Sequence, residues 1–201
     1  LCFLFFRMKK KKNNKKRLIW IVVSLLFIFV VIGLFFLFSS KNKESEYVFN
    51  GFTFYRSIAN TWKFKFNYQG QEYDVALRVD PKSLIAKNYK LVENYDMFLR
   101  LQSVNIFSDP DLDAKYTFGM YDLGKIFASV FGIKVNYGVS RSYADLAVYN
   151  CSEYGFYFTK NNESNKFYWL DKCLVINTTN ADVAIEYADF LVYHYLGVLN
   201  G

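Results

Sequence analysis

The chain has 201 residues and a net charge of +7, from 25 lysines and arginines against 18 acidic residues. Eight of the basic residues lie within residues 1–17, which contain no acid, so the rest of the chain carries 17 basic against 18 acidic side chains. A nucleic-acid-binding domain carries its basic residues clustered on a folded face. Because the excess charge here lies in a short tail, the composition argues against a nucleic-acid partner.

Residues 1–17 are expected to form a basic cytoplasmic tail. Within this tail, residues 1–7 read LCFLFFR and precede Met8, where a basic lead begins. We interpret residues 1–7 either as an upstream extension that is absent from the mature protein or as a short apolar cluster against the inner leaflet of a membrane. The sequence leaves both interpretations open.

Residues 18–38 form an uncharged apolar run, LIWIVVSLLFIFVVIGLFFLF. At about 1.5 Å per residue, a helix of this length reaches about 31 Å, which matches a hydrocarbon core of about 30 Å. The run is longer than the apolar region of a cleaved signal peptide, and no small-residue cleavage pattern follows it. The sequence therefore predicts an uncleaved signal anchor, a single transmembrane helix whose partner is the lipid bilayer.

The flanks of this apolar run predict its orientation. Seven lysines and arginines lie between Met8 and the run, whereas residues 39–46 beyond it contain two lysines and two glutamates. Positively charged flanks stay on the cytoplasmic side of a membrane. We therefore expect a plasma-membrane protein with its N-terminus in the cytoplasm, a short linker over residues 39–46, and an extracytoplasmic domain over residues 47–201.

The first part of the expected domain has the pattern of antiparallel strands. An Asn50-Gly51 pair separates two short aromatic runs, which favours a tight hairpin turn. Apolar and polar residues then alternate over 62–68 and again over 73–79, on either side of a Gln69-Gly70 turn. Alternation on both arms of a turn predicts a half-buried hairpin, which Pro81 should end.

The second part predicts strands mixed with two helices. Apolar residues at helical spacing over 114–132 predict a helix with Asp113 as its N-cap, and a last helix is expected between Asn180 and Gly197. Strands are expected near 98–107, 146–149, 155–159, 167–170 and 173–176. This order predicts an α+β fold in which two helices pack on a mostly antiparallel sheet.

Cys151 and Cys173 are the two cysteines of the expected outer domain. Disulfides persist outside the cytoplasm, and the spacing of the two residues suits no common zinc or redox motif. We therefore predict that they form a disulfide. In the chain-entropy model, closing a loop of about 23 residues stabilises a fold by about 3 kcal/mol.

Other residues that could take part in catalysis or metal binding have simple structural interpretations. His194 is expected to be a packed residue of the last helix, because no catalytic partner is recognisable in the sequence. Asp109, Asp111 and Asp113 lack the glycine and glutamate of a calcium loop, so we interpret them as helix-capping residues. No metal site, cofactor or catalytic residue is expected. Three N-x-S/T sequons mark candidate glycosylation sites at Asn150, Asn162 and Asn177.

The chain resembles a loosely defined group of uncharacterised small archaeal proteins with one membrane span and an outer domain. The resemblance rests on four matching stretches, namely FNGFTF (49–54), Cys151, DKCLVINTT (171–179) and ADFLVYHYLG (188–197). It covers the chain from Met8 onward and implies this topology and fold. No activity is attached to the group, so the resemblance implies no functional residues.

The sequence is compatible with two classes of function. The first is a non-enzymatic, membrane-anchored outer module that binds a membrane protein, an envelope protein or a glycan, with a pilin-like envelope subunit as a variant. The second is an outer hydrolase-like enzyme with carboxylates scattered in sequence, such as Asp109, Asp145, Glu153 and Asp171. A concave pocket that brings two such carboxylates together would favour the enzyme.

Overall fold

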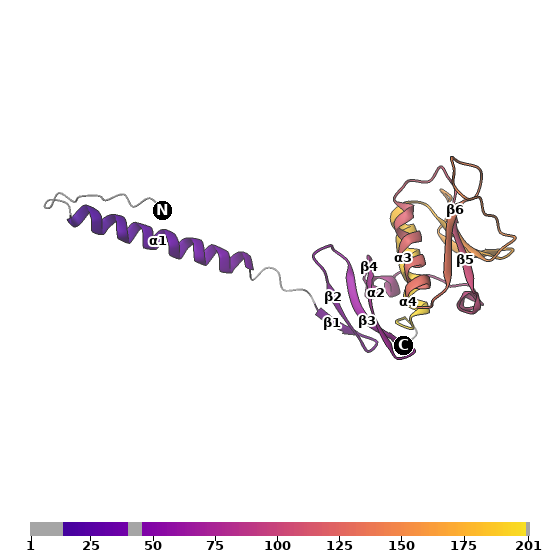
Figure 1. The fold of residues 1–201 in the computed structure, drawn as a ribbon, viewed down its shortest axis with the longest axis horizontal. Helices are drawn as coiled ribbons and strands as arrows, with labels where there is room; N and C mark the ends of the chain where they lie inside the picture. The colour runs from indigo at the N-terminus through magenta and orange to yellow at the C-terminus, as the bar shows by residue number, and fades with distance from the viewer. Residues whose placement is uncertain (1–13, 40–45, 200–201) are drawn as a thin grey trace, which may run out of the picture. The chain divides into compact units, whose positions relative to one another are not determined.

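The computed structural model describes residues 14–39 and 46–199. The chain divides into two compact units, residues 1–44 and 45–201, which we describe separately (Figure 1). Residues 1–13 of the predicted tail over 1–17, and with them the interpretation of residues 1–7, lie outside the described residues. Residues 40–45 of the predicted linker over 39–46 also lie outside them.

The first unit contains one helix, α1 (Asn14–Ser39). Its side chains are described over residues 20–33, where twelve large apolar side chains are 46–71% exposed. Among the described residues, no helix combines the length and the apolar character needed to cross a membrane.

The second unit begins with a four-stranded antiparallel sheet in the order β1-β2-β3-β4. Its strands are β1 (Glu46–Phe49), β2 (Phe52–Arg56), β3 (Trp62–Tyr68) and β4 (Gln71–Leu77). Both predicted hairpins are confirmed. At each turn the two central residues have positive φ, 46° and 82° at Asn50-Gly51 and 52° and 82° at Gln69-Gly70. Such backbone angles define the tight turns that match the twist of paired strands.

Two short helices separate the sheets, α2 (Pro81–Ala86) and the 3₁₀ helix η2 (Tyr95–Arg100). The predicted strand over 98–107 is therefore wrong in its first five residues, because residues 98–100 belong to η2 and β5 begins only at Ser103. Phe98 explains the difference, because its ring is fully buried and stacks on Phe156 at 4.2 Å and on Trp169 at 5.6 Å between ring centroids. These long-range contacts override the local strand pattern.

The second sheet has five strands in the order β6-β5-β7-β9-β8. They are β5 (Ser103–Ser108), β6 (Lys134–Val139), β7 (Gly155–Lys160), β8 (Lys166–Leu170) and β9 (Cys173–Thr178). Three of its four pairings are parallel, and only β8 pairs antiparallel with β9. We call it the mixed sheet.

The mixed sheet corrects the predicted single, mostly antiparallel sheet, although the α+β class holds. β6 was not expected, because its sequence KVNYGV is short and half polar. The predicted strand over 146–149 is instead an isolated bridge between Val139 and Val148. β9 is buried at all six positions, which is typical of a central strand in a parallel sheet covered on both faces.

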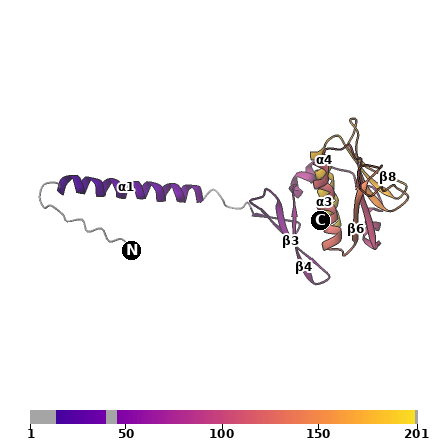
Figure 2. The same cartoon turned by 45° about the horizontal axis from the view of Figure 1, so that its top comes forward.

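Helices α3 (Tyr116–Ser129) and α4 (Ala181–Tyr195) lie between the two sheets (Figures 1 and 2). On one side, the Tyr193 ring of α4 lies 5.9 Å from that of Phe64 in β3. On the other side, the Phe127 ring of α3 lies 5.3 Å from that of Phe156 in β7. The two helices thus form the middle layer of a sheet–helix–sheet core.

The middle layer depends on close contact between α3 and α4 at Gly119. A Cβ at this position would lie 3.1 Å from the backbone oxygen of Ala184 and 3.2 Å from the Cβ of Ala188. Glycine at this position lowers the helix propensity of α3, but it lets the backbones of α3 and α4 lie close to each other. Gly119 thus has a packing role within α3.

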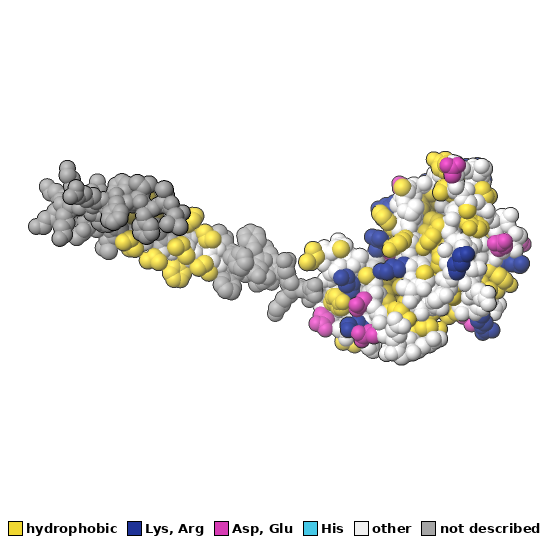
Figure 3. Space-filling model, in the orientation of Figure 1, with side chains coloured by type: hydrophobic (Ala, Val, Ile, Leu, Met, Phe, Trp, Pro, Cys, Tyr) yellow, Lys and Arg dark blue, Asp and Glu magenta, His cyan; other side chains and the backbone are white. Residues whose placement is uncertain are grey.

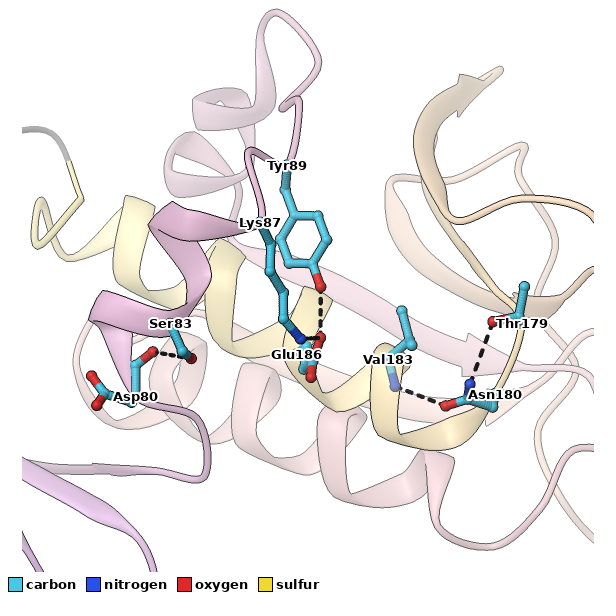
Figure 4. A network of polar contacts seen from close by, with 8 residues as sticks. All are labelled: Asp80, Ser83, Lys87, Tyr89, Thr179, Asn180, Val183 and Glu186. Carbon is cyan, nitrogen blue, oxygen red and sulfur yellow. Dashed lines mark hydrogen bonds and ion pairs between the residues drawn. The ribbon is translucent and has the colours of Figure 1, made fainter.

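Polar contacts hold α2 and the loop after it on α4 (Figure 4). Glu186 of α4 accepts a hydrogen bond of 2.6 Å from the Tyr89 hydroxyl and also pairs with Lys87. At the start of α4, the Asn180 side chain accepts a hydrogen bond from the backbone N–H of Val183. The predicted N-cap is thus confirmed.

Candidate functional site

Polar residues gather where the parallel strands of the mixed sheet end. β5, β6 and β7 run in the same direction, and Ser108 at the end of β5 is in register with Val139 in β6 and Phe158 in β7. The next residues along these three strands are Asp109, Ser140 and Thr159. In open sheets with parallel strands, ligands bind outside this carboxyl edge.

The Asp109 carboxylate is the centre of this cluster. It accepts hydrogen bonds from the hydroxyls of Ser140 (2.7 Å), Tyr157 (2.5 Å) and Thr159 (2.7 Å). Burial alone would raise the pKa of Asp109, but the three hydroxyl donors and the nearby charge of Arg141 outweigh burial and lower it. The carboxylate is therefore ionised at neutral pH and fixed in place by three strands.

The pKa of the neighbouring Tyr157 is shifted in the opposite direction. Burial, and then the hydrogen bond and charge of Asp109, raise the pKa of the Tyr157 hydroxyl. The phenol keeps its proton at neutral pH and acts as a donor to Asp109. The cluster is thus a negative charge held by neutral hydroxyls.

A cavity of about 460 Å³ lies over this edge of the sheet. Its walls are formed by Asp109, Asp111, Leu112, Arg141, Lys160 and Asn162. Its volume lies in the range of small-molecule sites in proteins. The cavity therefore combines two acidic and two basic side chains from the loops after β5, β6 and β7.

The two cations of this cavity differ in their partners. Arg141 forms an exposed ion pair with Asp111, and such a pair contributes about 0–1 kcal/mol to stability. Lys160, at the end of β7, is exposed and forms no ion pair with any residue that the structure describes. A ligand can therefore reach one uncompensated positive charge beside a weakly held guanidinium.

The predicted disulfide between Cys151 and Cys173 is present, with a sequence separation of 22. Cys173 is the first residue of β9, and Cys151 lies in the loop before β7. The crosslink therefore lies at the amino edge of the mixed sheet, opposite the Asp109 cluster. Its position is that of a structural crosslink.

The three sequon asparagines differ in exposure. The side chains of Asn150 and Asn162 are exposed, whereas Asn177 in β9 is 3% exposed. Asn150 accepts hydrogen bonds from the backbone N–H and hydroxyl of Ser152. Asn162 lines the 460 Å³ cavity, so a glycan there would cover the site.

The carboxylates proposed from the sequence for an enzyme lie in different places. Only Asp109 lines the cavity. Glu153 accepts a hydrogen bond of 2.8 Å from the Asn105 side chain, which lies four residues before Asp109 and hence about 13 Å away along an extended chain. Asp145 and Asp171 are exposed in loops. Over the described parts of the chain, no three His, Cys, Asp or Glu residues are placed to hold a metal ion.

The predicted N-cap of α3 at Asp113 is wrong, because the N-cap is Lys115, which makes no side-chain capping bond. The Asp113 carboxylate accepts a hydrogen bond of 2.8 Å from the backbone N–H of Lys115, just before α3. Asp109 and Asp111 instead line the cavity; the sequence offered Asp109 only as one of four scattered carboxylates of an enzyme, and it did not indicate Asp111 as a site residue. The available signal was an aspartate directly after a buried strand, but its meaning depends on the parallel neighbours β6 and β7.

His194 lies on α4 as a packed residue, as the sequence predicted. Its ring contacts Phe190, with 4.5 Å between ring centroids, and Tyr95 at 6.0 Å. It does not line the cavity at the carboxyl edge.

Comparison of the chain with protein-family models, with curated proteins and with solved structures found no match.

Proposed function

We propose that the chain is a membrane-anchored, extracytoplasmic binding domain that recognises an anionic group at the carboxyl edge of its mixed sheet. The observation that carries this proposal is the 460 Å³ cavity in which Lys160 and Arg141 stand beside the fixed Asp109 carboxylate. Two cations with few competing partners favour a carboxylate or phosphate of a ligand. The partner is a membrane or envelope component that carries such a group.

The anchor is supported by residues 18–38, which are uncharged and long enough for a bilayer core. The large apolar side chains described within α1 are exposed on all sides of the helix, which a soluble helix with one buried face would not be. The basic lead before the run supports a cytoplasmic N-terminus. The disulfide is compatible with an oxidising compartment for the domain.

The lowered pKa and the hydrogen bonds of Asp109 favour a binding site over a site of acid–base catalysis. A general acid or base needs a pKa near the working pH, and the pKa of Asp109 is lowered. Its three hydroxyl partners also come from the protein itself. We infer that Asp109 positions the ends of β6 and β7, and with them Arg141 and Lys160.

The test uses the full chain in lipid nanodiscs and two small anionic probes, methyl glucuronide and glycerol 3-phosphate. Saturation-transfer NMR should show contact of at least one probe with the protein. The double variant Arg141→Glu/Lys160→Glu should abolish this contact, because it places four acids around the cavity. Equal signals from the variant and the unaltered chain would overturn the proposal.

Lys90→Glu is the matched control for charge reversal. Lys90 is exposed and lies outside the cavity, so its reversal should leave probe contact unchanged. If Lys90→Glu reduced the signal as much as the double variant, the probes would be responding to overall charge. That result would also overturn a site at the carboxyl edge.

A further inference from the structure

A second cavity, of about 360 Å³, lies on the other side of the same strand ends, between α3 and β6. We call it the apolar cavity; its walls include Thr117, Met120, Tyr121, Tyr137, Val139 and Leu146. At its mouth, Tyr121, Tyr137 and Leu146 are 57%, 47% and 53% exposed. Apolar side chains gather on the surface in the region of α3 and β6 (Figure 3).

Two glycines build the walls of the apolar cavity. A Cβ on Gly124 would lie 2.0 Å from the Tyr137 hydroxyl oxygen, so the missing side chain lets Tyr137 lie over α3. A Cβ on Gly138 would lie 2.3 Å from the backbone oxygen of Ala147. The loop after β6 therefore approaches that strand closely, and the Val139 N–H donates a 2.9 Å hydrogen bond to the same oxygen.

The apolar cavity and the 460 Å³ cavity, which we call the charged cavity, are lined by residues that are close in the chain. Ser108 lines the apolar cavity, and the next residue, Asp109, lines the charged one. In β6 and the loop after it, Val139 lines the apolar cavity and Arg141 the charged one. Consecutive Cα atoms are about 3.8 Å apart, so the linings of both cavities come together around the ends of β5 and β6.

We infer that the ligand is an amphiphilic anion that occupies both cavities. Its apolar chain lies among Met120, Tyr121 and Leu146, and its carboxylate or phosphate lies at Lys160 and Arg141. An apolar pocket with a few convergent polar groups is the usual form of a small-molecule site. The headgroup contact rests on the proposed function, whereas the apolar cavity is an independent observation.

The experiment is photolabelling of the full chain in nanodiscs. One arm adds dodecanoic acid with a diazirine near the end of its chain, and the other arm incorporates a phospholipid with a diazirine in one acyl chain. After irradiation, mass spectrometry of peptides locates the label. We expect label within residues 117–121 and 137–146. Labelling in the first arm alone assigns a free fatty acid, and labelling in the second arm assigns a membrane phospholipid.

Leu146→Asp places a charge in the mouth of the apolar cavity and should reduce this labelling at least tenfold. Val148→Asp is its matched control, because Val148 is equally exposed, at 54%, but does not line the cavity. A second pair, Thr117→Trp and Ala128→Trp, compares a bulky residue at the mouth with one at a position of α3 outside the cavity. This pair keeps the test decisive if one aspartate variant fails to fold.

Two results would overturn the inference. If both arms fail to label residues 117–121 and 137–146 while the small anions still bind, the apolar cavity holds no ligand and the proposed function stands. If label persists unchanged in Arg141→Glu/Lys160→Glu, the two cavities do not share an anionic ligand and the inference fails, whereas the proposed function is decided by the contact of the small anions alone.

Discussion

Asp109 and Asp189 have pKa values displaced in opposite directions, because their carboxylates are compensated to different degrees. Asp109 has three hydroxyl donors and a nearby arginine. Asp189 of α4 is fully buried and accepts two backbone N–H donors, from Arg78 and Val79, at one oxygen. Its other oxygen has no hydrogen-bond partner among the described residues. Burial, and then the charge of Asp122, raise the pKa of Asp189 well above its ordinary value.

Asp109→Asn should destabilise the domain at neutral pH by about 1–2 kcal/mol, since a charged acceptor of three hydrogen bonds is lost. The folded-state pKa of Asp109 is lowered, so its contribution is present above the unfolded value of about 3.9 and is lost as the pH falls through the folded value. Urea unfolding at pH 7 and pH 3 should therefore show a larger difference from the unaltered chain at pH 7 than at pH 3. An equal difference at both values would contradict an ionised Asp109, and exposed Asp145→Asn should show none.

The expected pH dependence at Asp189 has the opposite sign. Its folded-state pKa is raised, so its contribution to stability is largest below the unfolded value and is lost as the pH rises through the folded value. Asp189→Asn removes this titration. In urea unfolding between pH 4 and pH 8, the variant should gain stability relative to the unaltered chain as the pH rises, by up to about 1.4 kcal/mol per pH unit. A constant difference would show that Asp189 does not change its protonation on folding.

The buried position of Asp189 could not be foreseen from the sequence around it. Asp189 stands among aromatic and aliphatic residues of the predicted last helix, in the stretch YADFLVYHY over 187–195. The partners of Asp189, the backbone N–H groups of Arg78 and Val79, lie 111 and 110 residues away. A buried carboxylate is explained only by such distant donors, and no periodicity within the helix indicates them.

Among the strands and helices, those with strong local signals were predictable. The turn glycines predicted the positions of the hairpins in the antiparallel sheet, and Asn180 predicted the start of α4. The parallel pairing of β5 with β6 was not predictable from alternation, because it depends on the crossover through α3. The charged cavity was missed for the same reason, since Asp109, Arg141 and Lys160 meet only when three parallel strands end together.

The disulfide joins the loop before β7 to the first residue of β9. Local sequence patterns predict each segment but not that the two lie together. Because the disulfide closes a loop with a sequence separation of 22, its removal should reduce the free energy of unfolding by about 3 kcal/mol. Urea unfolding of the unaltered chain with and without reductant should show this loss. The double variant Cys151→Ser/Cys173→Ser should be equally destabilised and insensitive to reductant. A smaller effect of reductant on the unaltered chain than about 1 kcal/mol would contradict a stabilising crosslink.

At the scale of the whole molecule, the net charge of the chain is concentrated before residue 18, and the domain is nearly neutral. The seven lysines and arginines after Met8 account for the whole net charge of +7. The domain can therefore carry a local cationic site at Lys160 and Arg141 without attracting anions over its entire surface. Selectivity for one anionic ligand is compatible with such a surface, whereas a uniformly basic domain would bind polyanions in general.

Replacing the seven lysines and arginines between Met8 and Leu18 with glutamine should randomise the orientation of the chain, because the proposed topology rests on these positive charges staying in the cytoplasm. With Cys2→Ser and Asn67→Cys, an exposed position of β3, a membrane-impermeant maleimide should label intact cells fully when the lysines and arginines are present. The glutamine variant should be labelled only in part until the cells are lysed. Absence of labelling before lysis in the chain with its basic lead would contradict the proposed topology, and glutamine at Lys41 and Lys43 is the matched control that should change nothing.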